Sequence, residues 1–142
     1  ELCWAALLHD IGKIGVEDKI LRKESSLDEQ EWNIMRTHPE IGAQIVRGLS
    51  GLENIAPLIL SHHERMDGKG YPRGLQGDEI PLGARIIAVV DSYSAMTEGR
   101  PYRPARSHRE ALIELRKHSG TMYDSGVVEK FISIFDGGIN AE

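Results

Sequence analysis

Apolar residues recur at helical spacing along most of the chain, and polar residues at their boundaries supply helix starts. Ile41, Ile45 and Val46 follow a possible cap at Thr37, and an unbroken apolar run precedes Asp91. The pattern predicts helices over 2–9, 26–36, 37 to about 49, 54–64, 81–97, 107–118 and 124–135, with an irregular stretch over 14–23. We therefore expect an all-α helical bundle.

Two short polar patterns fix helix starts more closely. Ser26 with Glu29, and Ser107 with Glu110, have the spacing of a capping box. The run 86–90 has the local preference of a strand, but its length and the absence of an evident partner strand favour a helix. Residues 66–80 hold four glycines and are predicted to form a long loop, of the kind that carries function.

Composition limits the class of protein. With 142 residues, 40% hydrophobic and 27% charged, the chain fits a single globular domain. Its net charge of −5 argues against DNA as a partner. The single cysteine, Cys3, rules out an intrachain disulfide and is expected to be a buried helix residue. No apolar run is long enough to span a bilayer, so this segment should not contact a membrane. The chain starts at Glu1, so we expect it to be a piece of a longer protein.

Histidine and aspartate gather in a way that core packing does not require. His62 and His63 are adjacent and lead into the glycine-rich loop, and Asp91 ends an apolar run where a lone carboxylate would be costly. The candidate metal ligands are His9, Asp10, His38, His62, His63 and Asp91. Imidazole and carboxylate together suit first-row transition metals, and two bridged ions can clamp a phosphate.

These residues stand in blocks that resemble the HD-GYP domain, a branch of the HD phosphohydrolase superfamily. Residues 9–13 read HDIGK, residues 38–42 read HPEIG, and residues 62–72 read HHERMDGKGYP. The blocks occur in the expected order over nearly the whole chain. The resemblance implies that residues 1–142 are an HD-GYP domain, an HD-type helical bundle with a glycine-rich GYP loop, lacking its N-terminal helix or helices and any upstream regulatory domain.

The resemblance also implies a function. Family members are metal-dependent phosphodiesterases that open cyclic di-GMP to pGpG, and some continue to GMP. It implies two or three divalent ions, iron or manganese, on the six ligands, with Asp10 as the bridging carboxylate. Lys13 would neutralise charge growing on the phosphoryl oxygens. The expected substrate contacts are Lys13, Gly70, Tyr71, Pro72, Arg100 and Arg103, in a cytoplasmic bacterial signalling enzyme.

Two alternatives to a cyclic di-GMP phosphodiesterase stay open. The domain could be a regulatory module that binds nucleotide or a signalling protein through the GYP loop, because Ser94 replaces an aspartate that the family often has. It could be an HD phosphohydrolase for a different nucleotide, although the GYP block argues against that. The number of ions, the final product and the pairing of two copies in a homodimer are also undecided.

Overall fold

A computed structural model describes residues 1–98 and 104–138. The elements in chain order are α1 (Leu2–Leu8), η1 (Ile11–Gly15), α2 (Asp18–Leu21), α3 (Glu29–Met35), α4 (His38–Arg47), η2 (Glu53–Ile55), α5 (Ala56–Ser61), η3 (Gly77–Glu79), α6 (Leu82–Thr97), α7 (His108–Lys117) and α8 (Ser125–Gly138). The described residues contain isolated β-bridges but no strand. The expectation of an all-α bundle is thus confirmed.

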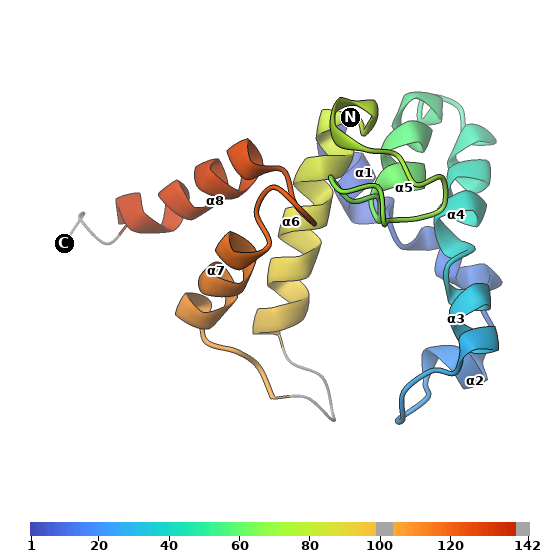
Figure 1. The fold of residues 1–142 in the computed structure, drawn as a ribbon. Helices are drawn as coiled ribbons and strands as arrows, with labels where there is room; N and C mark the ends of the chain where they lie inside the picture. The colour runs from blue at the N-terminus through green and yellow to red at the C-terminus, as the bar shows by residue number, and fades with distance from the viewer. Residues whose placement is uncertain (99–103, 139–142) are drawn as a thin grey trace.

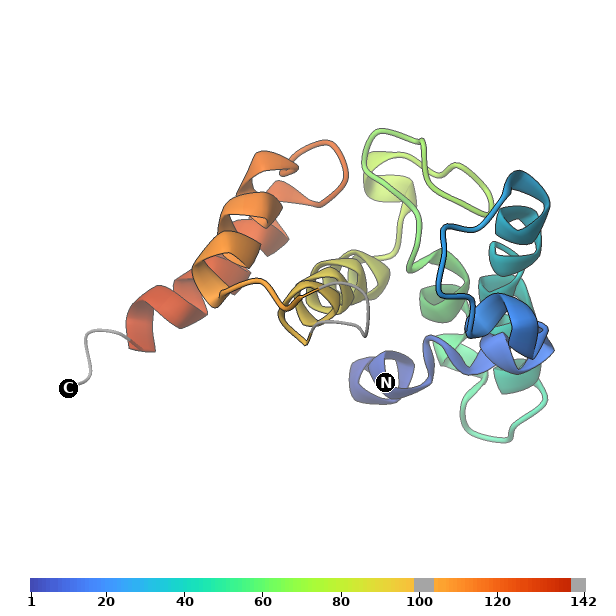
Figure 2. The ribbon, with the colours of Figure 1, turned by 90° about the horizontal axis from the view of Figure 1, so that it is seen from below.

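The long helix α6 lies at the centre and joins two apolar clusters (Figure 1). Its residue Ile87 packs in the first cluster with side chains from α1, α4 and α5, such as Ala5, Val46 and Ile59. Further along α6, Val89 and Met96 pack in the second cluster, which α7 and α8 complete. The two views agree that α7 and α8 lie on one side of α6, and α3, α4 and α5 on the other (Figures 1 and 2).

The apolar run 86–90 is helical, because α6 can bury alternate faces in both clusters. The capping box at Ser107 is confirmed: its hydroxyl accepts from the Glu110 amide, and the Glu110 carboxylate accepts from the Ser107 amide. The box at Ser26 is wrong by two residues. Asp28 and Glu31 form the capping box instead. Asp28 has the same spacing to a glutamate, and it directly precedes Glu29, the first residue of α3.

Other boundaries differ from the expectation in small ways. The predicted helix over 54–64 is divided into η2 and α5 and ends at Ser61. The helix that starts after Thr37 ends at Arg47, so Leu49 lies beyond it. The stretch 14–23 contains the end of η1 and all of α2. Cys3 is exposed, not buried, because α1 turns Ala5 toward the core and leaves its other face outside.

Among the described glycines, the one with the least room for a side chain, Gly12, lies beside the predicted ligands. A Cβ atom on Gly12 would lie 1.9 Å from the carbonyl oxygen of His38 and 2.5 Å from the amide nitrogen of Gly42. Only glycine allows η1 to contact α4 this closely. Gly12, three residues after His9, therefore allows η1 to pack directly against the start of α4.

None of the helices in the described part of the chain combines the length and the apolar character that a membrane crossing requires.

Candidate metal centre

The six predicted metal ligands come from four separate segments that meet at one place. His9 and Asp10 lie between α1 and η1, and His38 is the first residue of α4. His62 and His63 follow α5, and Asp91 lies in the middle of α6. One ligand atom from each of four of them falls within 4.8 Å of the others: Asp10, His38, His62 and His63. His9 and Asp91 complete the cluster on a second side.

Three of the imidazoles are held in one orientation by their own segments. In each, Nδ1 lies at hydrogen-bond distance from the carbonyl oxygen three residues earlier: His9 to Ala6 (2.7 Å), His38 to Met35 (2.8 Å) and His62 to Ile59 (2.6 Å). A carbonyl oxygen can only accept, so Nδ1 carries the proton and donates. Each Nε2 therefore presents its lone pair, which is how metal-binding histidines are usually fixed.

The two carboxylate oxygens of Asp10 face different partners. Oδ1 lies 3.3 Å from Nε2 of His38 and 4.0 Å from Nε2 of His62. Oδ2 lies 3.5 Å from Nε2 of His9 and 2.5 Å from Nζ of Lys13. Burial alone would raise the pKa of Asp10, but the contacts with His38 and Lys13 outweigh it and lower the pKa below its usual value. Asp10 is thus an ionised carboxylate with ligand nitrogens on both sides.

The cluster has the properties of a site built for a cation. Nε2 of His38 and Nε2 of His62 lie 3.4 Å apart, with both ring protons engaged elsewhere. Nε2 of His9 is buried and has no hydrogen-bond partner among the described residues; an oxygen of Asp91 lies 3.5 Å away. The Asp91 carboxylate raises the pKa of His9 because it stabilises positive charge at this ring, and a bound cation would take the place of the proton on Nε2. The donor set and the partnerless nitrogen therefore fit divalent metal binding.

His62 and His63 stay neutral at ordinary pH. Burial lowers the pKa of His62 to about 4 and that of His63 to about 3. The contact with His9 holds the pKa of Asp91 below its usual value. At neutral pH these groups are in the protonation state in which a metal ligand must be.

The GYP loop is fastened directly to this cluster. The Tyr71 ring stacks on His63 at a centroid distance of 4.9 Å, and the Tyr71 amide donates to the His63 carbonyl oxygen at 3.2 Å. Burial raises the pKa of Tyr71 to about 12, so it stays a phenol. Gly70 must be glycine, because a Cβ atom there would lie 2.5 Å from the Arg65 amide nitrogen. The loop therefore places Tyr71 at the metal cluster by its backbone as well as by its ring.

Glu64 holds the far side of the same loop. Its side chain is 4% exposed, and its two carboxylate oxygens accept from the amides of Arg73 (2.8 Å) and Leu75 (2.9 Å). Arg73 also donates through its guanidinium to the Ser61 hydroxyl at 2.9 Å. Glu64 is thus a buried carboxylate whose acceptors are both used by loop backbone.

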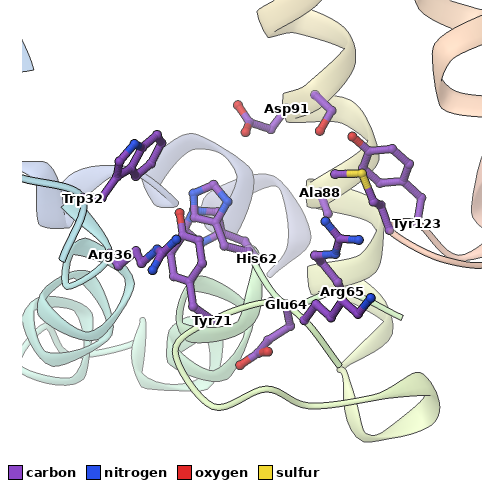
Figure 3. A pocket seen from close by; sticks show the side chains of 14 residues that line it. Trp32, Arg36, His62, Glu64, Arg65, Tyr71, Ala88, Asp91 and Tyr123 are labelled. Atoms are coloured by element: carbon purple, nitrogen blue, oxygen red, sulfur yellow. The ribbon is translucent and has the colours of Figure 1, made fainter. Parts of the chain in front are cut away.

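Two cavities flank the cluster. The first, of about 430 Å³, is lined among others by Arg36, Gly70, Met122 and Tyr123 (Figure 3). The second, of about 390 Å³, is lined among others by Asp10, Lys13, Lys23 and His38. Four residues line both cavities: Trp32, His63, Tyr71 and Asp91. The metal cluster thus lies where the two cavities meet.

The structure brings three of the six predicted substrate contacts to these cavities. Lys13, Gly70 and Tyr71 line at least one of them, whereas Pro72, which follows a cis peptide bond, is not among the lining residues. Arg100 and Arg103 lie outside the described residues. Among the wall residues that the sequence analysis did not name are Trp32, Arg36, Met122 and Tyr123. The spacing of Trp32 and Arg36, four residues apart beside the HPEIG block, was the one available signal.

Comparisons with known proteins agree with this picture. The family model described as HD domain matches residues 1–127. A cyclic di-GMP phosphodiesterase of Thermotoga maritima is 45% identical over 136 residues, which cover 94% of this chain and 37% of that protein. A 3'3'-cGAMP-specific phosphodiesterase 3 of Vibrio cholerae is 45% identical over 120 residues, covering 84% of this chain and 26% of that one. The chain thus spans between about a quarter and two fifths of the length of these relatives.

Two solved structures share the fold. The cyclic GMP-AMP phosphodiesterase V-cGAP3 of V. cholerae superposes with a TM-score of 0.66 at 23% identity, covering 99% of this chain and 40% of that one. The HDG"Y"P protein Bd1817 of Bdellovibrio bacteriovorus gives a TM-score of 0.70 at 21% identity, covering 95% and 43%.

Proposed function

Since the chain belongs to the HD domain family and its motif blocks resemble the HD-GYP branch, we propose that it is the core of a metal-dependent phosphodiesterase that hydrolyses cyclic di-GMP. The observation that carries the proposal is the placement of Asp10, whose two oxygens face separate groups of ligand nitrogens. A carboxylate so placed suits the bridging position between two ions. The names of the relatives support a cyclic dinucleotide as the substrate class.

The metal centre that we propose would hold two or three divalent ions, iron or manganese, on His9, Asp10, His38, His62, His63 and Asp91. Such ions supply Lewis acidity toward phosphoryl oxygens and lower the pKa of bound water. The protein contributes the orientation of the imidazoles, since three of them are already fixed through Nδ1.

Lys13 is the residue that we propose to neutralise the phosphoryl group. Its ammonium lies 2.5 Å from Asp10 and lines the second cavity, so a phosphodiester at the cluster would lie within its reach. Its side chain is 36% exposed, which leaves room to turn from the carboxylate toward a ligand. Tyr71, held as a phenol, offers a hydroxyl donor and a ring face on the opposite wall.

The test is hydrolysis of cyclic di-GMP, followed by chromatography, with protein loaded anaerobically with Fe(II) or Mn(II) and assayed for metal content. Asp10→Ala should lose both metal and product. Asp18→Ala, at a carboxylate whose side chain is 80% exposed, is the matched control and should keep both. Activity retained by Asp10→Ala would contradict the mechanism. Nucleotide binding without product from fully metallated protein would favour a regulatory module.

Lys13→Met gives a finer test of the mechanism. We expect kcat to fall about 100-fold, the usual cost of removing one group that stabilises transition-state charge. Metal content should stay near that of the unaltered protein, because Lys13 is not a ligand. Lys19→Met, at an exposed lysine paired with Glu17, should leave kcat unchanged. An unchanged kcat in Lys13→Met would remove Lys13 from the mechanism.

A substrate panel decides between cyclic di-GMP and 3'3'-cGAMP. The second nucleotide is a candidate because relatives of 39% to 45% identity are named as specific for it. We expect the higher kcat/KM with cyclic di-GMP; a higher value with 3'3'-cGAMP would reverse the assignment.

A further inference from the structure

Trp32 occupies a position that core packing does not explain. It lies on α3, a helix with no buried residue, and its side chain is 44% exposed. It nevertheless lines both cavities beside the metal cluster. An indole that contributes little to the core and borders both cavities leaves a large flat surface available to a ligand.

Arg36 fixes the orientation of this surface. Its guanidinium carbon lies 5.9 Å from the centre of the Trp32 ring and 5.8 Å from that of Tyr71, within the range of cation–π attraction. Tyr71 in turn stacks on His63. A continuous wall of planar groups thus runs from the metal cluster to Trp32, with Asp91 and Tyr123 across the cavity from it (Figure 3).

We propose that Trp32 stacks on a purine base of the substrate and thereby distinguishes nucleotides from other phosphate esters. The proposal rests on the proposed function, because it takes the phosphate of the substrate to lie at the Asp10 cluster. A nucleotide carries its base on the sugar next to that phosphate, so a phosphate held there brings a base to the adjoining wall. Aromatic rings accept bases by stacking because every base has a π-face.

The size of the effect follows from the chemistry of stacking. Removing an aromatic ring from a stacked base typically weakens binding by about 5- to 150-fold. Purines offer more surface than pyrimidines and should gain more. Trp32 acts on the base alone, so its removal should raise KM and leave kcat within about twofold.

The first experiment measures binding without turnover. Mn(II)-loaded protein is titrated calorimetrically with GMP and with ribose 5-phosphate, which share the phosphate and differ in the base. We expect GMP to bind about tenfold more tightly in the unaltered protein. In Trp32→Ala the two affinities should become equal, while that of ribose 5-phosphate is unchanged. Ile34→Ala, an exposed apolar residue of the same helix that lines neither cavity, should keep the preference.

A second readout reports stacking directly. Trp4 and Trp32 are the two tryptophans of the chain, so Trp4→Phe leaves Trp32 as the single indole. GMP should quench its fluorescence and ribose 5-phosphate should not. Trp32→Phe should keep part of the preference for GMP, because a smaller ring still stacks.

The outcomes separate this proposal from the proposed function. If Trp32→Ala still prefers GMP, or hydrolyses cyclic di-GMP with unchanged KM, the stacking proposal is overturned while the enzyme stands. If no protein produces pGpG or GMP but the preference for GMP depends on Trp32, the enzymatic proposal fails and the base subsite stands.

Discussion

Replacing Glu64 with glutamine is expected to loosen the GYP loop without removing any metal ligand. The carboxylate accepts from the amides of Arg73 and Leu75 through different oxygens, at 2.8 and 2.9 Å. A glutamine has one acceptor oxygen, and its NH₂ group would face the second amide, donor against donor. One of the two loop amides therefore loses its partner while the packing volume of the side chain is kept.

The magnitude follows from the type of bond and its burial. A hydrogen bond to a charged acceptor contributes about 1.5–3 kcal/mol. Leaving the buried amide without an acceptor also has a free-energy cost, but that cost describes the same lost bond from the side of the donor. The cost of the lost bond and the cost of the unpaired amide are therefore not added. We expect Glu64→Gln to cost about 1.5–3 kcal/mol. For a chain of this size about 2–4 °C accompanies each kcal/mol, so Tm should fall by roughly 3–12 °C.

Thermal unfolding and limited trypsin digestion at equal metal occupancy would measure the effect, since Lys69 gives trypsin a site within the loop. Glu79→Gln is the matched control: it lies in the same loop region and accepts one bond, from the Gln76 amide at 2.9 Å, but it is exposed. It should cost about 0.5 kcal/mol or less. Equal costs in the two variants, or an unchanged cleavage rate after Lys69 in Glu64→Gln, would refute the reasoning.

Two further substitutions test the frame around the site. Gly12→Ala would place a Cβ atom 1.9 Å from the His38 carbonyl oxygen and should lower the stability of the fold by about 3 kcal/mol or more, with reduced metal content. The control Gly48→Ala, where the added Cβ has no neighbour closer than 3.4 Å, should be near neutral. Similar Tm values for the two variants would contradict this prediction. Asp124→Asn keeps the acceptor at the start of α8 but loses the 2.8 Å ion pair with Arg85, at a cost of about 1–2 kcal/mol at pH 7. Arg85 lowers the pKa of Asp124 below 3.8, so the stabilisation by the ion pair is present above that pH and is lost as the pH falls through the folded-state pKa. Urea unfolding should therefore show that Asp124→Asn loses less stability at pH 3 than at pH 7. An equal loss at the two pH values would exclude the ion pair as its source.

The sequence was sufficient for the helices whose apolar spacing is long and regular. The run 86–90 could be assigned to a helix because a strand needs a partner and none was evident. The capping pattern alone does not choose between Ser26 and Asp28, because both satisfy it, and the reciprocal hydrogen bonds form at Asp28. The exposure of Cys3 depends on how α1 is rotated against the core, which seven residues of local pattern do not encode.

The site shows the same division between local and distant information. The motif blocks named five of the six ligand candidates because each block is contiguous in the chain, and Asp91 was named because it ends an apolar run. They could not tell which oxygen of Asp10 faces which histidine, since that depends on the contact between η1 and α4. Trp32 belongs to no quoted motif, and its position is seen only when α3 is placed beside the GYP loop. The roles of Arg100 and Arg103 stay predictions.

The fixing of three histidines by carbonyl oxygens of their own segments bears on how the protein exchanges its ions. Because that orientation is set by local backbone, a chelator should be able to strip the centre without unfolding the chain, and a new ion can enter a site already shaped. Imidazole and carboxylate donors rank divalent ions by their intrinsic affinity order more than by size. The ion carried by purified protein would then reflect the metals of the growth medium and the handling after lysis, and a catalytic survey has to begin by controlling that supply.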